Sequence, residues 1–242
     1  MSLRLGFDVD GVLADFRSAF QEAATRILGR SAVGQSSSAA LDPEALSPQD
    51  AKKVWRVLTD TPNWWLSVPP YEPVQIARLY QLARRFKWEV IFLTMRTHTA
   101  GDSAQLQTQT WLEAHGFYMP SVVTMAGSRG ELANASRLDL VVDDQLVNCV
   151  EVVGASQSKA VLLLRAPDSA LEQQATARGI GVVNTLEEAI AALLHLNEIL
   201  PQKQSRLVRL TDWFTRPSSE GHALPMNPRA SRPIPPPDDD RR

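Results

Sequence analysis

Short apolar runs recur along the chain, separated by segments in which apolar residues lie three or four positions apart. Leu3, Leu5 and Phe7 alternate with polar or small residues, which indicates a short strand close to the start. The continuous apolar run 90–93, and the run 138–142 that Asp139 interrupts, are typical of strands buried on both faces of a parallel sheet. The apolar segments 160–164 and 181–183 continue the alternation of strands and helices. The alternation of strands with helical segments predicts an α/β fold with a doubly wound, Rossmann-like parallel sheet.

Helical spacing accounts for much of the chain between and after these runs. The segments concerned are 16–28, 51–58, 74–86, 169–178 and 186–200. About eighty residues separate the first polar strand end from the second, more than a strand-helix-strand unit needs. We therefore expect a core formed by residues 1–15 and 74–200, with residues 16–73 inserted as a small helical cap. Residues 31–47, rich in Ser, Ala, Gly and Pro, are expected to form a mobile loop in this cap.

The composition changes after Pro201, and the last residues are runs of Pro, Asp and Arg that cannot build a core. We expect residues 201–242 to form a C-terminal extension that is largely disordered. One apolar cluster stands out in it, at Leu207, Leu210, Trp213 and Phe214. We expect this cluster to dock on the domain or on a second copy of the chain, which allows for a homodimer.

Polar side chains stand at the end of three predicted strands. The first strand ends in Asp8 and Asp10, the second in Thr94, and the third in Asp143 and Asp144. Because ligands of an open α/β sheet bind beyond the carboxyl ends of its strands, these side chains are expected to share one crevice. Adjacent acids there raise each other's pKa unless a cation neutralises them, and oxygen ligands favour Mg²⁺. Taken alone, the first two acids are also compatible with solvated carboxylates in a turn.

This ordered set resembles the motifs of the haloacid dehalogenase superfamily of phosphatases, in which Asp-x-Asp-Gly comes first, a Thr or Ser second and an acidic pair fourth. The resemblance implies that Asp8 is the nucleophile, which forms an aspartyl-phosphate, and that Asp10 is the general acid/base. It implies that Thr94 binds the phosphoryl group. It also implies a Mg²⁺ ion bound by Asp8, by Asp10 through its backbone carbonyl, and by one acid of the pair Asp143 and Asp144.

The third motif of this superfamily is usually a Lys that steadies the nucleophile and the transferring phosphate. In the corresponding segment, residues 127–133, the chain offers Arg129 at the expected start of a helix. A guanidinium keeps the charge and binds phosphate in a bidentate way. Arg129 is therefore the candidate, and Arg96, Arg137 and Lys159 are alternative sources of the cation. Lys159 follows the acidic pair, which argues against it.

Within the superfamily, the chain is similar to 5′-nucleotidases of the deoxyribonucleotidase type. Three stretches carry this similarity: 8–16 with its trailing Asp-Phe, the aromatic pair and prolines of 63–71, and 94–96 followed by 110–117. One of Trp64 and Trp65, together with Phe16, is expected to line an apolar slot for a nucleobase, since every base offers a face to stack on, and Arg96 completes the expected substrate-binding set. For the two tryptophans, packing of the cap against the core is the alternative.

The chain has 242 residues and a formal net charge of −2, so it can bury a sizeable core but has no field that gathers nucleic acid polymers or anionic lipid. Its single cysteine, Cys149, excludes an internal disulfide framework, suits a reducing compartment and is expected to be a packed thiol. No apolar run approaches membrane-spanning length, and the first residues lack a signal-peptide core. We therefore expect a cytoplasmic protein.

Together these observations predict a Mg²⁺-dependent phosphomonoesterase for a small soluble phosphate, with a nucleoside 5′-monophosphate as the favoured substrate. One alternative is the same chemistry on a sugar phosphate or another metabolite, a choice that the cap decides. The other is a binding or regulatory protein that has lost turnover because Arg129 replaces Lys. The presence of Asp8, Asp10, Thr94 and Asp143 argues against that loss.

Overall fold

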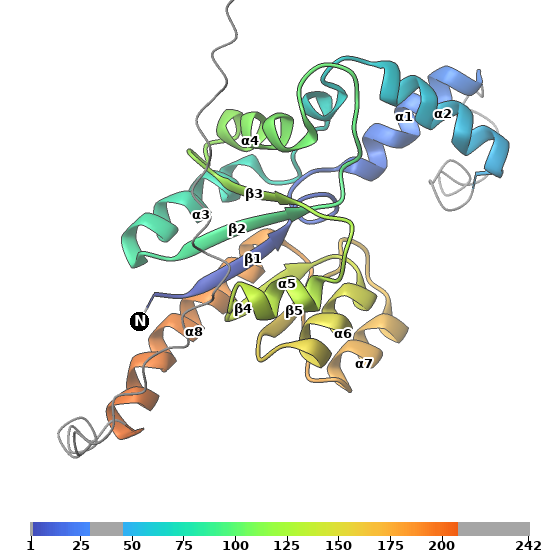
Figure 1. Ribbon diagram of the computed structural model, residues 1–242. Helices are drawn as coiled ribbons and strands as arrows, with labels where there is room; N and C mark the ends of the chain where they lie inside the picture. The colour runs from blue at the N-terminus through green and yellow to red at the C-terminus, as the bar shows by residue number, and fades with distance from the viewer. Residues whose placement is uncertain (1, 30–45, 208–242) are drawn as a thin grey trace, which may run out of the picture. The chain divides into compact units, whose positions relative to one another are not determined.

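The computed structural model describes residues 2–29 and 46–207 of the chain. In this part, six parallel strands form one sheet in the order β3-β2-β1-β4-β5-β6 (Figure 1). The strands are β1 (Arg4–Asp8), β2 (Glu89–Thr94), β3 (Ser121–Thr124), β4 (Leu140–Asp143), β5 (Lys159–Leu163) and β6 (Gly181–Val183). The strand order reverses between β1 and β4, which confirms the predicted doubly wound parallel sheet. Ligands of such sheets generally bind beyond the carboxyl ends of the strands at this switch point.

Helices connect these strands, and those at 16–28, 48–60, 73–86, 169–176 and 186–207 lie where helical spacing predicts them. They are α1 (Phe16–Leu28), α2 (Pro48–Asp60), α3 (Pro73–Phe86), α4 (Ala104–Ala114), α5 (Arg129–Ala135), α6 (Leu146–Ala155), α7 (Ser169–Thr176) and α8 (Leu186–Leu207), with a short 3₁₀ helix, η2 (Trp64–Ser67). The helix expected at 186–200 extends to Leu207, into the first residues of the expected C-terminal extension. The rest of that extension, from residue 208, and nearly all of the expected loop at 31–47 lie outside the described residues. None of the helices in the described ranges is long and apolar enough to cross a membrane.

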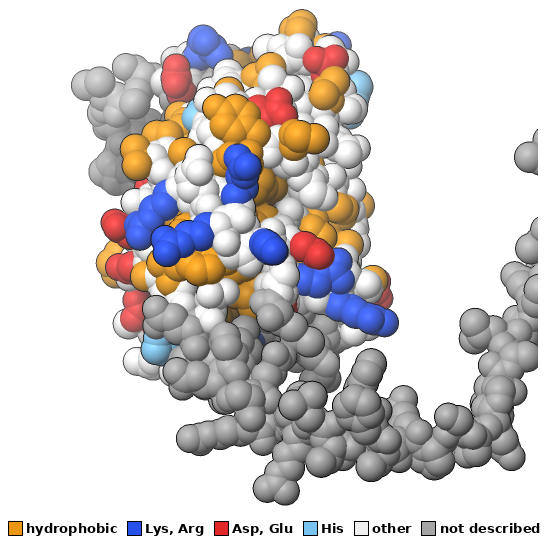
Figure 2. All heavy atoms as spheres, turned by 90° about the vertical axis from the view of Figure 1, so that its left-hand side faces the viewer, with side chains coloured by type: hydrophobic (Ala, Val, Ile, Leu, Met, Phe, Trp, Pro, Cys, Tyr) orange, Lys and Arg blue, Asp and Glu red, His pale blue; other side chains and the backbone are white. Residues whose placement is uncertain are grey.

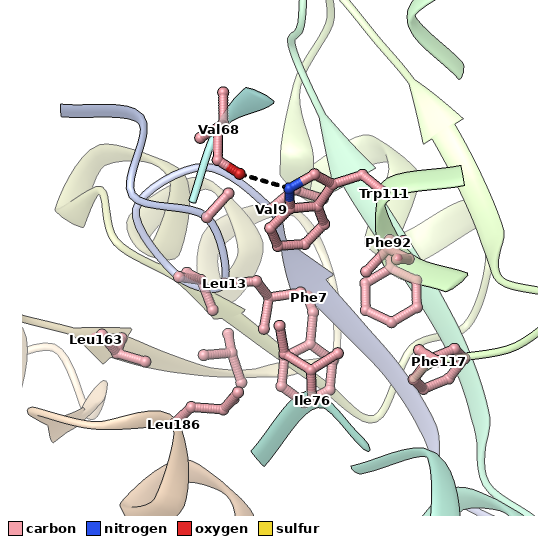
Figure 3. Packing of buried hydrophobic residues seen from close by; sticks show 14 of the residues in the cluster. Phe7, Val9, Leu13, Val68, Ile76, Phe92, Trp111, Phe117, Leu163 and Leu186 are labelled. Carbon is pink, nitrogen blue, oxygen red and sulfur yellow. Dashed lines mark hydrogen bonds between the residues drawn. The ribbon is translucent and has the colours of Figure 1, made fainter. Parts of the chain in front are cut away.

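Successive residues of the central strands feed two apolar cores on opposite faces of the sheet. Phe7 and Val142 belong to one core, which they share with residues of α3, α4 and α8 (Figure 3). Val141, one residue before Val142, belongs to a second core with residues of α5, α6 and α7. Cys149 is buried in this second core, which agrees with its expected role as a packed thiol. Both faces of the sheet are covered, as the continuous apolar runs require.

The edge strand β3 is not evident from the sequence pattern. It has four residues, of which only Val122 is fully buried, while Ser121 and Thr124 are exposed at its two ends. Such a strand gives neither a continuous apolar run nor a long alternation. Its place is fixed instead by parallel pairing with Ile91 to Thr94 of β2.

Two short linkers join the segment 16–73 to the sheet, and they pair with each other. The outgoing linker follows β1 through a tight loop in which the amides of Leu13 and Ala14 both donate to the carbonyl of Val9 at 2.8 Å. The Asp15 amide donates to the carbonyl of Pro69 at 2.7 Å, and Ala14 and Pro70 form an isolated bridge. Asp15 also caps α1, because its carboxylate accepts the Ser18 amide at 3.0 Å. The segment is thereby attached next to the strand end that carries Asp8 and Asp10.

A cavity of about 230 Å³ lies at the opposite edge of the sheet, near the starts of β2 and β3. Aromatic side chains of Tyr80, Trp88 and Phe117 contribute to its walls, and none of its lining residues is acidic. The face drawn in Figure 2 carries basic, acidic and apolar side chains interspersed with one another. The carboxylates that the sequence singles out therefore lie elsewhere, at the carboxyl ends of the strands.

Candidate active site

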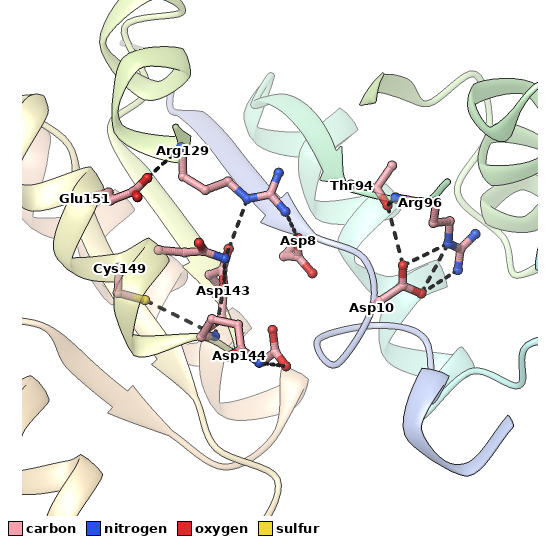
Figure 4. Close-up of polar contacts among 11 residues, drawn as sticks. Asp8, Asp10, Thr94, Arg96, Arg129, Asp143, Asp144, Cys149 and Glu151 are labelled. Carbon is pink, nitrogen blue, oxygen red and sulfur yellow. Dashed lines mark hydrogen bonds and ion pairs between the residues drawn. The ribbon is translucent and has the colours of Figure 1, made fainter. Parts of the chain in front are cut away.

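Three neighbouring strands end in polar side chains at one edge of the sheet. Asp8 is the last residue of β1, Thr94 the last of β2 and Asp143 the last of β4. The strands are parallel and adjacent, with Asp8 paired to Leu93 and Phe7 paired to Val142, so their ends meet as predicted (Figure 4). Asp8 is 6% exposed, Thr94 1% and Asp143 0%. These are buried polar groups in a site, not solvated turn residues.

Arg129 brings a positive charge between two of these acids. It is the first residue of α5, whose N-cap is Ser128, and the residue as a whole is only 3% exposed. Its guanidinium forms an ion pair with Asp8 through Nη2, and its Nε lies 3.4 Å from the Asp143 Oδ2 atom. The Nη1 atom is buried and has no hydrogen-bond partner among the described residues. One strong donor at this edge is therefore open to a further acceptor.

The alternative cations lie elsewhere. Both Arg137, two residues after α5, and Lys159, the first residue of β5, are exposed. Arg96 is buried, but its charge is matched by Asp10. Of these four cations, Arg129 alone contacts Asp8. It therefore lies beside the candidate nucleophile, as the sequence motif predicts.

Glu151 of α6 fixes the start of α5, a contact that the sequence analysis missed. Its Oε2 atom accepts the Ser128 hydroxyl at 2.8 Å and the Arg129 amide at 3.2 Å. A carboxylate at this position also suits the positive end of the helix dipole. Gly130 allows the two helices to approach, because a Cβ there would lie 2.2 Å from the Glu151 carbonyl oxygen. Nothing in the sequence near Glu151 indicates this pairing, since the two segments are brought together only by the fold.

Asp10 points away from Asp8 and toward Arg96 (Figure 4). The Arg96 guanidinium donates to both carboxylate oxygens, from Nη2 to Oδ1 at 2.9 Å and from Nε to Oδ2 at 3.0 Å. Arg96 lies between two indoles, with its Cζ atom 4.9 Å from the ring centre of Trp65 and 5.6 Å from that of Trp111. Thr94 accepts the Arg96 amide at 3.1 Å. This bidentate, aromatic-flanked ion pair holds the Asp10 carboxylate firmly at the side of the site.

The aromatic pair predicted to line a base slot is built into the packing of the segment 16–73. Trp64 is 6% exposed and Trp65 2%. Their ring centres are 4.8 Å apart, both contact Phe16, and the Trp65 indole donates to the Thr97 carbonyl at 2.8 Å. Phe16 is only partly covered. Both tryptophans are therefore packed inside the segment 16–73 in this structure. Of the three aromatic residues, Phe16 is the one that keeps exposed surface.

The acids at this edge have the donor atoms that suit a hard divalent cation, and they carry excess charge. Asp8 and Asp143 share one guanidinium, that of Arg129, and Asp144 adds a third carboxylate directly after Asp143. The Asp144 carboxylate lies against the loop after Asp10, since a Cβ on Gly11 would come within 2.1 Å of its Oδ2 atom.

In residues 2–29 and 46–207, however, no three acidic, His or Cys side chains converge as a metal site requires. Arg129 contacts two of the expected ligands, Asp8 and Asp143, and the Asp10 carboxylate is turned to Arg96. The donor chemistry fits Mg²⁺, and the structure brings the expected ligands to one edge without closing them around one point.

The pKa values at this edge follow from the same crowding of acids. Burial raises the pKa of Asp8 well above its usual range, the charge of Asp143 raises it further, and the Arg129 charge offsets only part of this. Burial, and then the charge of Asp143, raises the pKa of Asp144 from 3.8 to about 7. Burial also raises the pKa of Asp143, against the hydrogen bonds that it accepts from the Gln145 amide and the Asn148 side chain at 2.9 Å. Additional positive charge at this edge would lower the pKa of these acids and favour their ionised forms.

Comparison with known proteins gives the fold a family context. No protein-family model and no curated protein sequence matches the chain. Among solved structures, a predicted phosphatase from Clostridium acetobutylicum superposes with a TM-score of 0.56 at 10% identity, over 81% of this chain and 99% of that one. A haloacid dehalogenase-like hydrolase from Streptococcus pneumoniae gives 0.52 at 10% identity, over 79% and 98%.

A third similar structure is a HAD family hydrolase from Deinococcus radiodurans with bound phosphate and sodium. It gives a TM-score of 0.51 at 13% identity, over 80% of this chain and 96% of that one. At identities this low, the likeness is one of fold. The chain thus has the α/β fold of the haloacid dehalogenase-like hydrolases, as its sequence motifs predicted.

Proposed function

We propose that this chain is a phosphomonoesterase that acts through an aspartyl-phosphate on Asp8. The observation that carries the proposal is the Arg129 guanidinium, buried beside Asp8 with its Nη1 atom lacking a partner among the described residues. Leaving a buried donor unpaired is costly, and a phosphoryl oxygen is an acceptor that guanidinium geometry suits. The phosphate bound to the Deinococcus radiodurans protein of the same fold is consistent with this assignment.

In the proposed reaction, a carboxylate oxygen of Asp8 attacks phosphorus, an O–P bond forms, and the P–O bond of the ester breaks. The leaving oxygen takes a proton from Asp10. A water molecule then attacks the aspartyl-phosphate, gives its proton to Asp10, and releases inorganic phosphate from the restored Asp8 carboxylate. Since Arg96 holds the Asp10 carboxylate away from Asp8, Asp10 must turn from Arg96 before it reaches the leaving oxygen.

Thr94 and Arg129 take the remaining roles. The Thr94 hydroxyl stands at the end of β2, next to Asp8, where it donates to a phosphoryl oxygen while the Arg129 guanidinium binds a second one. Mg²⁺, held by Asp8, the Asp10 carbonyl and an acid of the pair Asp143 and Asp144, would supply the charge that keeps Asp8 ionised beside a phosphate dianion.

For the substrate, we propose a small phosphorylated metabolite. The resemblance of the first and second motifs to deoxyribonucleotidases favours a nucleoside 5′-monophosphate. The second candidate is a sugar phosphate. Burial of Trp64 and Trp65 favours it, because of the three aromatic residues expected to stack on a base only Phe16 keeps exposed surface.

The test is hydrolysis of an aryl phosphate by the full-length chain, with and without Mg²⁺. We expect turnover that requires the metal and that is abolished in Asp8→Asn, because an amide does not attack phosphorus but keeps nearly the same shape. Thermal unfolding of the variant is the control for folding. Full activity of Asp8→Asn refutes the mechanism, and an inactive wild-type chain refutes the function. A panel of nucleoside monophosphates and sugar phosphates then decides between the two substrate classes.

A further inference from the structure

Arg165 lies two residues after β5 and contacts the loop that follows Asp10. Its guanidinium donates to two backbone carbonyls of that loop, from Nε to Gly11 at 3.4 Å and from Nη2 to Val12. The side chain is 20% exposed, so most of it is covered. Three segments distant in sequence, 11–12, 71–72 and 165, therefore meet at one side chain.

The linker that returns from the segment 16–73 to the sheet binds the same guanidinium. Nη1 forms an ion pair with Glu72, and the Cζ atom lies 4.2 Å from the ring centre of Tyr71. Glu72 is itself fixed, because its carboxylate accepts the amides of Leu186 at 2.8 Å and Glu187 at 3.3 Å at the start of α8. The Arg165 guanidinium is thus held from one side and presents its remaining donors to the loop.

The loop itself has little freedom on its other side. Gly11 has a φ of 87°, in the left-handed region, and the Asp144 carboxylate lies where a side chain on Gly11 would stand. The Gly11 amide donates to the Ala14 carbonyl at 2.9 Å. Arg165 and Asp144 therefore bound the backbone directly after Asp10 from two directions.

We propose that Arg165 is a positioning residue, which holds the loop after Asp10 by binding the carbonyls of Gly11 and Val12. This rests on the proposed function, in which Asp10 transfers the proton to and from the reacting oxygens. Arg165 touches none of the reacting atoms. It acts through the placement of Asp10, and a misplacement of about 1 Å in such a group costs on the order of 100-fold in rate.

The experiment compares Arg165→Met with Asp168→Ala. Asp168 is in the same connection after β5 and caps α7 by accepting the amides of Ala170 and Leu171 at 3.0 Å, so its loss destabilises this region without touching the loop. We expect Arg165→Met to lower kcat for an aryl phosphate by about 10-fold to 100-fold with KM within about threefold. We expect Asp168→Ala to lower the melting temperature but keep the wild-type kcat.

Hydrogen exchange supplies a measurement that does not depend on turnover. The amides of Leu13 and Ala14, which bond to Val9, are expected to exchange faster in Arg165→Met than in wild type and unchanged in Asp168→Ala. Unchanged exchange at these amides, or a kcat within twofold of the Asp168→Ala value, overturns the proposal. Should Arg165→Met not fold, Arg165→Lys takes its place, with an intermediate loss of kcat expected because an ammonium lacks the planar fork.

The two proposals fail in different ways. If wild type hydrolyses no phosphate ester, the proposed function fails, and with it the catalytic part of the Arg165 proposal. The exchange measurement then still decides whether Arg165 holds the loop. If wild type is active and Arg165→Met is equally active, the Arg165 proposal alone fails.

Discussion

Arg129→Met is the substitution that most directly tests how the site is held together. The Arg129 side chain is 4% exposed and contacts the carboxylates of Asp8 and Asp143, which are themselves 8% and 0% exposed as side chains. Methionine has a similar length and an apolar end, so it fills the space without the charge. The variant therefore leaves two buried acids without their cationic partner.

The expected loss of stability depends on pH. Removing one partner of a buried ion pair costs about 3–5 kcal/mol when the other stays charged. Burial and Asp143 already raise the pKa of Asp8, and loss of the Arg129 charge raises it further. An acid whose pKa is raised by folding stabilises the fold below its unfolded pKa and loses that contribution as the pH rises through the folded pKa. We therefore expect the loss of stability to grow as the pH rises, from a smaller loss in acid to a larger one at alkaline pH.

The expected loss of rate comes from the missing donor. Removing one preorganised donor to a developing negative charge lowers kcat by about 10² to 10³. Arg129→Lys keeps the charge and is expected to keep or raise the activity. Arg137→Met, an exposed substitution two residues after the end of the same helix, is the matched control, for which we expect wild-type kinetics and stability. Steady-state kinetics on an aryl phosphate with Mg²⁺, with thermal unfolding at pH 5 and 8, measures both effects. Wild-type kinetics for Arg129→Met would assign the cationic role to another residue, with Arg96 tested next.

Three further expectations follow from the same site. Burial and Asp143 raise the pKa of Asp144 to about 7, so Mg²⁺ must displace a proton from it at pH 5 but not at pH 8. The increase in melting temperature caused by Mg²⁺ is therefore expected to be larger at pH 8, and Asp144→Asn is expected to remove most of that difference. An equal increase at both pH values contradicts metal binding by Asp144. Asp10→Asn is expected to lower kcat by about 10² to 10⁴, and an effect below about threefold reassigns the proton transfer. Trp65→Leu is expected to lower kcat/KM equally for a nucleoside monophosphate and a small sugar phosphate, because the Trp65 indole packs on the Arg96 guanidinium. A fall in kcat/KM that is confined to the nucleotide and corresponds to about 1–3 kcal/mol would instead support stacking of the base on Trp65.

The sheet and its polar edge were predictable because their signals are local. Each buried strand needs a continuous apolar run, and parallel strands place their ends together, so Asp8, Thr94 and Asp143 follow from the sequence alone. Arg129 required the family pattern in addition, since nothing local in the sequence distinguishes it from Arg137, which follows the same helix.

The remaining parts of the site depend on contacts between distant segments. Glu151 meets Ser128 and Arg129 across 22 or 23 residues, and Arg165 meets Gly11 across 154. No spacing rule connects such positions, because the fold as a whole sets their separation. The strand β3 was missed for a related reason, since pairing with β2 stabilises it more than its own four residues do.

The contacts of Asp10 change what a substitution in the aromatic cluster means. Trp65 lies over Arg96, and Arg96 binds both oxygens of Asp10, so the packing of the segment 16–73 reaches the proposed acid/base without a substrate in between. Arg165 reaches the same residue from the other side, through the loop carbonyls. A loss of activity after a change in this cluster is therefore not evidence of base binding by itself. Only a loss that differs between substrates separates recognition of a nucleobase from the positioning of Asp10, because positioning affects every phosphate ester alike.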